Sequence, residues 1–297
     1  MKTILPLSLA FIFLFAGCNQ DDLPISGEGL SVTIGERVVI TAGDIDYYDL
    51  STHFIYLKSP NSFLNEKLYR DSFQVYADGE KIYTGVFHSW VMSSIPLGPA
   101  IYTPVIFYPD YVVPIAFGSY TDIDGEKIPP TDPRSDARIL SALKSHNQLH
   151  EGLQCEIRSV QFNPGGKVSL ELELINNDSF NYYYLDPQKM GLGLFHYFTN
   201  GLSLWNPTLK KSFENHVEHL QSQSYDSWEM NWLSLINSHE KKTIWIHYTN
   251  FDQLPAGQYK LFFRFPGLSK VGKSELVQRN GRIWLGELDL SQDIQIK

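Results

Sequence analysis

The sequence predicts a mainly β protein, built from two β-sandwich domains that a short helix joins. The chain has 297 residues, and at about 100–200 residues per domain this length favours two domains. Aromatic residues make up 14% of the chain and charged residues only 19%, a composition typical of β-rich domains. Short segments in which apolar and polar residues alternate recur between turn residues, as strands of such domains do.

The first domain, an irregular β-sandwich over residues 30–131, contains the clearest hairpin of the chain. Asp78-Gly79 lies between two alternating segments, and this dipeptide favours the positive φ angles of a type I′ turn. Pro104 and Pro114 should restrict their strands to sheet edges or bulges, because proline has no amide to donate. The strands expected here are residues 31–34, 37–41, 52–57, the hairpin 73–83, 101–107 and 111–117.

A linker helix is expected within residues 132–150. Asp132-Pro133 supplies an N-cap followed by proline at the first helical position, and the helix should end near Ser145. Ile139, Leu140 and Leu143 form one apolar stripe. Such a helix is suited to packing on a sheet or to bridging two domains.

The second domain, over residues 151–297, alternates most regularly from Val168 to Leu174. About seven strands are expected in all, a number that matches an immunoglobulin-like sandwich. The segment Pro255-Ala256-Gly257-Gln258-Tyr259 resembles the turn and penultimate strand of bacterial immunoglobulin-like modules, which implies a fold class and no function. The further strands expected are residues 182–185, 193–198, 243–248, 258–265 and 282–290, with a long insert at 206–240.

The N-terminal 17 residues have the pattern of a secretory signal peptide: Lys2, an apolar run from Ile4 to Phe15, and small residues before Cys18. The segment Phe15-Ala16-Gly17-Cys18 resembles the lipobox of bacterial lipoproteins. That resemblance implies cleavage before Cys18 and a lipid on its sulfur, with Phe15 where leucine is usual. The alternative is an ordinary signal peptide with a chance cysteine.

Residues 18–29 should form an acidic, flexible tether. Asn19-Gln20-Asp21-Asp22 resembles the signal that exports lipoproteins of the Bacteroidota to the outer face of the outer membrane. The resemblance implies a lipid-anchored protein of the outer membrane, displayed on the cell surface. An acidic solvated linker without export information is the alternative.

Four aromatic residues are candidate ligand contacts: Trp205, Trp228 and Trp232 in or beside the long insert, and Tyr183 within Tyr182-Tyr183-Tyr184. Consecutive strand residues face opposite sides of a sheet, so at least one of the three tyrosines should face solvent or a loop. Exposed rings of this kind stack on sugars or grip peptides. Packing in a sandwich core is the competing interpretation.

Asp122 and Asp124, before Gly125, are the best candidates for a calcium site, since alternating carboxylates at a tight turn suit a cation that prefers oxygen ligands. The complete loop pattern is absent, and Asp-Gly also forms ordinary turns. No other cofactor is expected. His216 and His219 could share a helix face, but a zinc site would usually recruit cysteines, so a surface histidine pair is favoured.

The net charge of −9, without clustered basic residues, argues against nucleic acid as a partner. Gly267–Ser274 matches the P-loop pattern, but no strand–loop–helix unit follows, so nucleotide binding is rejected in favour of a hairpin loop with two exposed lysines. Cys155 lies on an apolar strand face and is expected to be a buried, inert thiol.

Without a catalytic signature, the sequence favours a binding or accessory module for an extracellular glycan or protein, held at the membrane by its lipid. The alternative is a secreted hydrolase with carboxylates, or a His/Glu metal site, between the domains. A third possibility is a structural or inhibitor-like module that works through a free sandwich edge.

Overall fold

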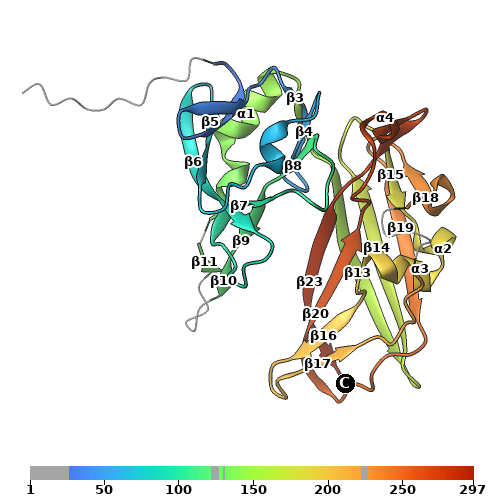
Figure 1. Cartoon of the computed structure of the whole chain (residues 1–297). Helices are drawn as coiled ribbons and strands as arrows, with labels where there is room; N and C mark the ends of the chain where they lie inside the picture. Colours follow the sequence, from blue (N-terminus) through green and yellow to red (C-terminus); the bar gives the residue numbers. More distant parts are fainter. Residues whose placement is uncertain (1–26, 122–126, 130, 222–226) are drawn as a thin grey trace, which may run out of the picture.

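The computed structural model describes residues 27–121, 127–129, 131–221 and 227–297. They form a mainly β protein with several sheets, and the elements fall into an N-terminal part, residues 27–150, and a C-terminal part, residues 151–297 (Figure 1). Within the described ranges, no strand of one part shares a sheet with a strand of the other. None of the helices there is long and apolar enough to cross a membrane.

The N-terminal part contains a six-stranded sheet, a four-stranded sheet and a small hairpin. Its strands are β1 Leu30–Ile34, β2 Arg37–Ile40, β3 Ile45–Asp49, β4 Phe54–Leu57, β5 Ser72–Ala77, β6 Glu80–Ser89, β7 Gly98–Thr103, β8 Val112–Pro114, β9 Ala116–Gly118, β10 Tyr120–Thr121, β11 Lys127–Ile128 and β12 Leu149–His150. Its helices are the 3₁₀ helices η1 Ser62–Asn65 and η2 Pro133–Ser135, and α1 Ala137–Ser145. The sheet orders are β2-β1-β5-β6-β7-β9, β12-β3-β4-β8 and β10-β11.

The predicted hairpin is confirmed: β5 and β6 pair around Asp78 and Gly79, which both have positive φ, 49° and 79°. The two proline-containing segments, expected as strands over 101–107 and 111–117, differ from that expectation. β7 ends at Thr103, before Pro104, and pairs in parallel with β6. β8 contains Pro114 and is an edge strand, in agreement with the missing amide.

Helix α1 packs within the N-terminal part. Asp132 caps η2 and Asp136 caps α1, each by accepting a hydrogen bond from the backbone amide two residues ahead. Ile139 and Leu143 are buried, and α1 lies against β1 and β5. After the helix, β12 pairs in parallel with β3, so the chain leaves the N-terminal part only after His150.

The C-terminal part contains three sheets, of order β13-β14-β19, β18-β15-β22-β21 and β17-β16-β20-β23. Its strands are β13 Leu153–Asn163, β14 Lys167–Asn176, β15 Tyr182–Leu185, β16 Ser203–Asn206, β17 Lys211–Glu214, β18 Leu233–Ile236, β19 Lys241–Tyr248, β20 Gly257–Pro266, β21 Val277–Gln278, β22 Gly281–Ile283 and β23 Glu287–Ile296. Its helices are α2 Pro187–Met190, α3 Leu192–Phe198, α4 Lys273–Leu276 and the 3₁₀ helix η3 Met230–Trp232.

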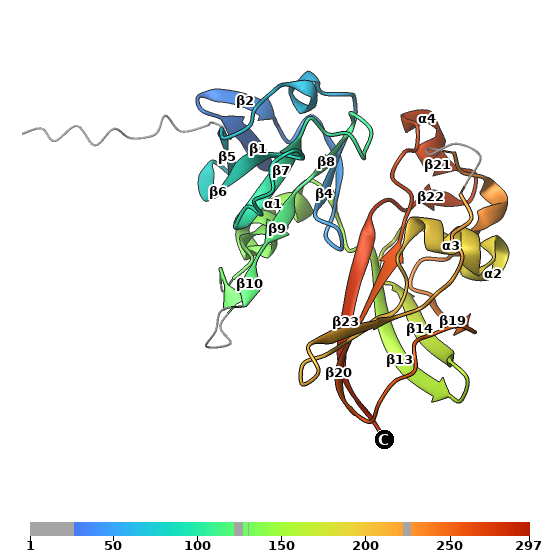
Figure 2. The same cartoon turned by 60° about the horizontal axis from the view of Figure 1, so that its bottom comes forward.

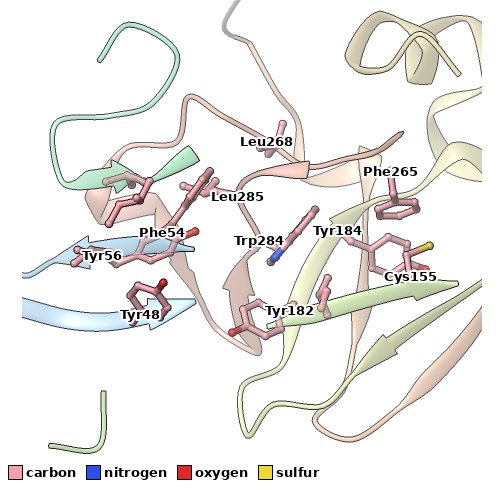
Figure 3. Packing of buried hydrophobic residues seen from close by; sticks show 14 of the residues in the cluster. Tyr48, Phe54, Tyr56, Cys155, Tyr182, Tyr184, Phe265, Leu268, Trp284 and Leu285 are labelled. Carbon is pink, nitrogen blue, oxygen red and sulfur yellow. The ribbon is translucent and has the colours of Figure 1, made fainter. Parts of the chain in front are cut away.

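The alternation predicted from Val168 to Leu174 is confirmed in β14, the middle strand of its sheet. Val168, Leu170, Leu172 and Leu174 are all buried. The same alternation on β20 buries Tyr259 and Leu261, so one face of each of these strands contributes to the core. Figure 3 shows this core from close by, with Cys155, Tyr184 and Phe265 grouped on one side.

Two expected strands are wrong. Residues 193–198 form helix α3, which follows α2 directly. Asp186-Pro187 begins α2 with the same N-cap and proline signal that was recognised at Asp132-Pro133. Residues 282–290 are not one strand but the end of β22 and the start of β23, with Trp284 buried between them and Gly286 at a φ of 111°.

Side chains from both parts form a joint between them. The Tyr111 hydroxyl donates to the Val271 carbonyl at 2.6 Å. Lys273 Nζ donates to the Leu57 carbonyl at 2.7 Å and lies 3.1 Å from Asp46 Oδ2. The expectation of two exposed lysines at 267–274 is therefore wrong for Lys273, because its ammonium is held against the N-terminal part.

Candidate functional site

A cleft of about 1190 Å³ lies between the two parts. Residues around β4, β8 and β9 line it on the N-terminal side, and the starts of β13 and β23 line it on the C-terminal side. Figure 2 shows where these strands lie in the two parts. Its volume is larger than the roughly 300–1,000 Å³ typical of pockets for small molecules. A ligand that filled it would be larger than a typical small molecule.

Aromatic side chains form one wall of the cleft. Trp90 stacks on Tyr102 with ring centroids 4.4 Å apart, and Phe107 meets Trp90 edge-on at 4.6 Å. Next along the chain, Tyr108 packs edge-on against Phe54 at 4.7 Å. We call these five residues the aromatic wall. The Trp90 indole donates to the Pro104 carbonyl at 3.2 Å, yet 43% of this residue is exposed, so its ring is both held in place and open to a ligand.

His53 adds a polar group to the same side of the cleft. It follows the turn before β4 and has a left-handed φ of 57°, uncommon for a residue with a side chain. Its Nδ1 lies 2.7 Å from the Tyr48 hydroxyl. Burial, together with the nearby Arg134 guanidinium, lowers the pKa of His53 to about 4. The imidazole is therefore neutral at pH 7.

The opposite wall carries a charged group centred on Arg264. Its Nε lies 2.8 Å from Asp289 Oδ1 and its Nη1 lies 3.1 Å from Glu287 Oε2. Burial raises the pKa of Glu287 above its usual value. The charged residues lining the cleft are two arginines, Arg134 and Arg264, and three acids, Glu151, Glu287 and Asp289. Because Arg134 is already paired with Asp132 outside this set, the cleft is mildly acidic.

The four aromatic residues predicted as ligand contacts do not line this cleft. Trp228 and Trp232 are partly buried against the core, as is Tyr183, whose neighbours Tyr182 and Tyr184 are fully buried. Trp205 is 37% exposed but belongs to β16, at the end of the C-terminal part away from β15 and β18 (Figure 1). Trp228, Trp232 and Tyr183 pack against the core and keep part of their surface exposed.

Sequence reasoning missed the aromatic wall, although one signal was available. The segment from Ser89 to Pro109 contains no Asp, Glu, Lys or Arg, in a chain with a net charge of −9. It includes Trp90, Tyr102, Phe107 and Tyr108. A long uncharged segment rich in aromatic residues is unusual at a surface and indicates an interaction site.

The residues predicted to carry a lipid or to bind calcium, Cys18, Asp122 and Asp124, lie outside the described residues. His216 Nε2 lies 2.8 Å from Asp252 Oδ1, at the surface. Within the described part of the chain, no three His, Cys, Asp or Glu side chains gather as a metal-binding group.

The chain matches no protein-family model, and no curated protein is detectably similar to it in sequence.

Proposed function

We propose that this chain is a lipid-anchored protein of the bacterial outer membrane, displayed on the cell surface, whose cleft is a binding site for an extended ligand. The observation that carries the proposal is the aromatic wall, with Trp90 held by a backbone hydrogen bond and still 43% exposed. A partly exposed tryptophan fixed in this way presents a large apolar surface with little further loss of conformational freedom on binding.

Two features of the cleft support recognition rather than turnover. Glu287 and Asp289, the two carboxylates of the charged wall, are both paired with the Arg264 guanidinium, so they form one fixed ion-paired group. The joint is polar and aromatic, with Lys273 held at two oxygen atoms of the N-terminal part. It fixes the two walls relative to each other, which suits a preformed binding site.

The membrane anchor in this proposal rests on the sequence around Cys18. A lipid on its sulfur, at about 0.8 kcal/mol per buried methylene, would hold the chain at the membrane. Replacement of the cysteine, Cys18→Ser, should abolish both incorporation of labelled lipid and sedimentation with membranes. Unchanged sedimentation of the variant would refute the anchor and leave the cleft proposal intact.

The binding site is tested by presenting the chain from residue 18 onward to arrays of oligosaccharides and of unstructured peptides. Trp90→Ala should weaken saturable binding by about 10-fold or more, the scale on which aromatic anchors contribute to interfaces. Trp205→Ala is the matched control, because Trp205 is exposed to a similar degree, 37%, outside the cleft. Equal loss in both variants, or none in Trp90→Ala, would contradict a ligand site at the aromatic wall.

A further inference from the structure

The cleft meets strand β23 along its edge. Four consecutive residues of this strand, Glu287–Leu290, all line the cleft. Successive side chains of a strand point to opposite faces of the sheet, so a cleft above one face would be lined by alternate residues only. A run of four places part of the cleft beside the strand, while Arg264 and Pro266 of β20 line a part that lies over the face of the sheet. β23 is the last strand of β17-β16-β20-β23, so no strand is hydrogen-bonded to this side of it within the described chain, although β13 of the neighbouring sheet contacts β23.

The same pattern recurs around the cleft. Pro114–Phe117, a consecutive run over β8 and β9, lines it from the N-terminal part, and Leu153–Cys155 at the start of β13 lines it from the C-terminal part. Each of these three strands is also the last of its sheet among the described residues. Sheet ends from both parts of the molecule therefore converge on one cleft.

A sheet edge of this kind carries backbone groups that a partner strand can use. In an antiparallel pair, every second residue directs its N–H and C=O toward the neighbouring strand, and the residues between direct theirs away from it. β23 is paired in register with β20 from Pro266↔Glu287 onward. Within Glu287–Leu290, two residues therefore direct their backbone groups away from β20, on the side where the cleft lies.

From this geometry we propose that the ligand of the cleft is an extended polypeptide segment, which adds to β23 as a further strand. This inference rests on the proposed function, because it uses the same site and names the ligand class. Main-chain hydrogen bonds to β23 would provide register, and the aromatic wall opposite would receive side chains of the segment. Four residues at about 3.4 Å each span roughly 14 Å, enough for a segment of about four to six residues.

The charge of the cleft indicates which segments fit. Three acids and two arginines line it, and Arg134 is already neutralised by Asp132. A segment rich in Asp or Glu would meet Glu287 and Asp289 at the edge of β23, where only Arg264 offers a positive charge. A neutral or basic segment is therefore favoured, and the affinity of a basic segment should fall as salt is added.

The first test is a library of unstructured peptides, neutral, basic and acidic, presented to the purified chain from residue 18 onward. Neutral or basic members should bind, and a bound peptide is then N-methylated at one backbone position at a time. A methyl group removes the donor and obstructs strand pairing, so affinity should fall by about 10-fold or more at every second position and little in between. Loss at consecutive positions, or at none, would overturn strand addition.

The second test changes the charges beside the edge. The double variant Glu287→Gln, Asp289→Asn should weaken binding of basic peptides several-fold and reduce its dependence on salt. Asp293→Asn is the matched control, since Asp293 is an exposed acid on the same strand outside the cleft. Equal effects of the double variant and the control would contradict docking at the start of β23.

The two proposals can fail separately. Binding of oligosaccharides that requires Trp90, with no binding of any peptide, would overturn the polypeptide ligand and leave the cleft as the binding site. Peptide binding unaffected by Trp90→Ala, but with the alternating N-methyl pattern and sensitivity at Glu287 and Asp289, would retain strand addition and remove the aromatic wall from the site. Absence of any binding that depends on cleft residues would overturn both.

Discussion

The imidazole Nδ1 of His150 lies 2.7 Å from the carboxylate Oδ1 of Asp178, and this contact spans the joint between the two parts of the molecule. Phe180 stacks on the same imidazole at 3.7 Å, and the Tyr182 hydroxyl donates to the other oxygen of Asp178 at 2.8 Å. Burial alone would raise the pKa of Asp178, but the contact with His150 and the hydrogen bond from Tyr182 lower it to about 2.

Asp178→Asn should reduce the free energy of unfolding by about 3 kcal/mol at pH 7. The NH₂ group of asparagine would face hydrogen-bond donors at a position where the buried carboxylate oxygen accepts from them. In the parent chain, the carboxylate's contribution is present above pH 4 and lost as the pH falls through about 2, since its folded pKa lies below the unfolded value. Chemical denaturation from pH 2 to 7 measures both effects. A stability of the variant equal to that of the parent at pH 7 would contradict the role of the carboxylate.

Asp49 is a second buried acid near the joint, with the opposite behaviour. Its Oδ1 accepts hydrogen bonds from the Ser51 amide and hydroxyl, but its buried Oδ2 has no hydrogen-bond partner. Burial therefore dominates and raises the pKa of Asp49 to about 6. Its stabilising contribution is complete below about pH 4 and is lost as the pH rises through 6.

Asp49→Asn should therefore stabilise the protein at pH 7.5, by about 1–2 kcal/mol once the cost of a buried amide is allowed for, and have little effect at pH 4. Thermal unfolding of parent and variant at the two pH values provides the comparison. A variant that is less stable than the parent at pH 7.5 would show that the charged carboxylate is accommodated better than its surroundings indicate.

Lys273→Met should loosen the joint, because it removes the bonds to Asp46 and Leu57. Global stability should fall by only about 1 kcal/mol, since both charged groups are partly exposed. The distribution of distances between spin labels placed on the two parts should broaden. Arg279→Met, an exposed substitution in the same segment, is the control and should leave that distribution unchanged.

Cys155 should resist thiol reagents in the folded protein. Its side chain is almost fully buried, and burial raises its pKa to about 12. Alkylation at pH 8 is expected to be at least about 100-fold slower in the native chain than in denaturant, because the thiolate is the reacting species. Rapid labelling without denaturant would reveal an exposed thiol at the base of the cleft.

Local signals predicted much of the secondary structure. The Asp78-Gly79 hairpin and the alternation along β14 were recognised because each depends on residues within a few positions of one another. Residues 193–198 were misassigned as a strand because a short apolar run has no clear period of its own. The Asp186-Pro187 cap, a local signal, would have corrected that error.

The candidate site was less predictable. The sequence drew attention to Trp228 and Trp232, which the fold uses for packing, and passed over Trp90, Tyr102 and Phe107. A tryptophan in the core and a tryptophan in a cleft have the same local pattern, because burial is decided by which segments meet. The uncharged run from Ser89 to Pro109 was an available indication, but Met190–Leu209 is uncharged over a similar length, so the signal did not single out this segment.

The sequence by itself determined a mainly β chain, the turn at Asp78-Gly79 and the helix after Asp132, because short-range sterics and hydrogen bonds govern these features. Only the tertiary structure decided that β8, β9, β13 and β23 meet at one cleft, which Trp90 also lines. Where the two parts meet depends on contacts between residues more than 100 positions apart, such as Tyr111 with Val271, and no local pattern encodes these.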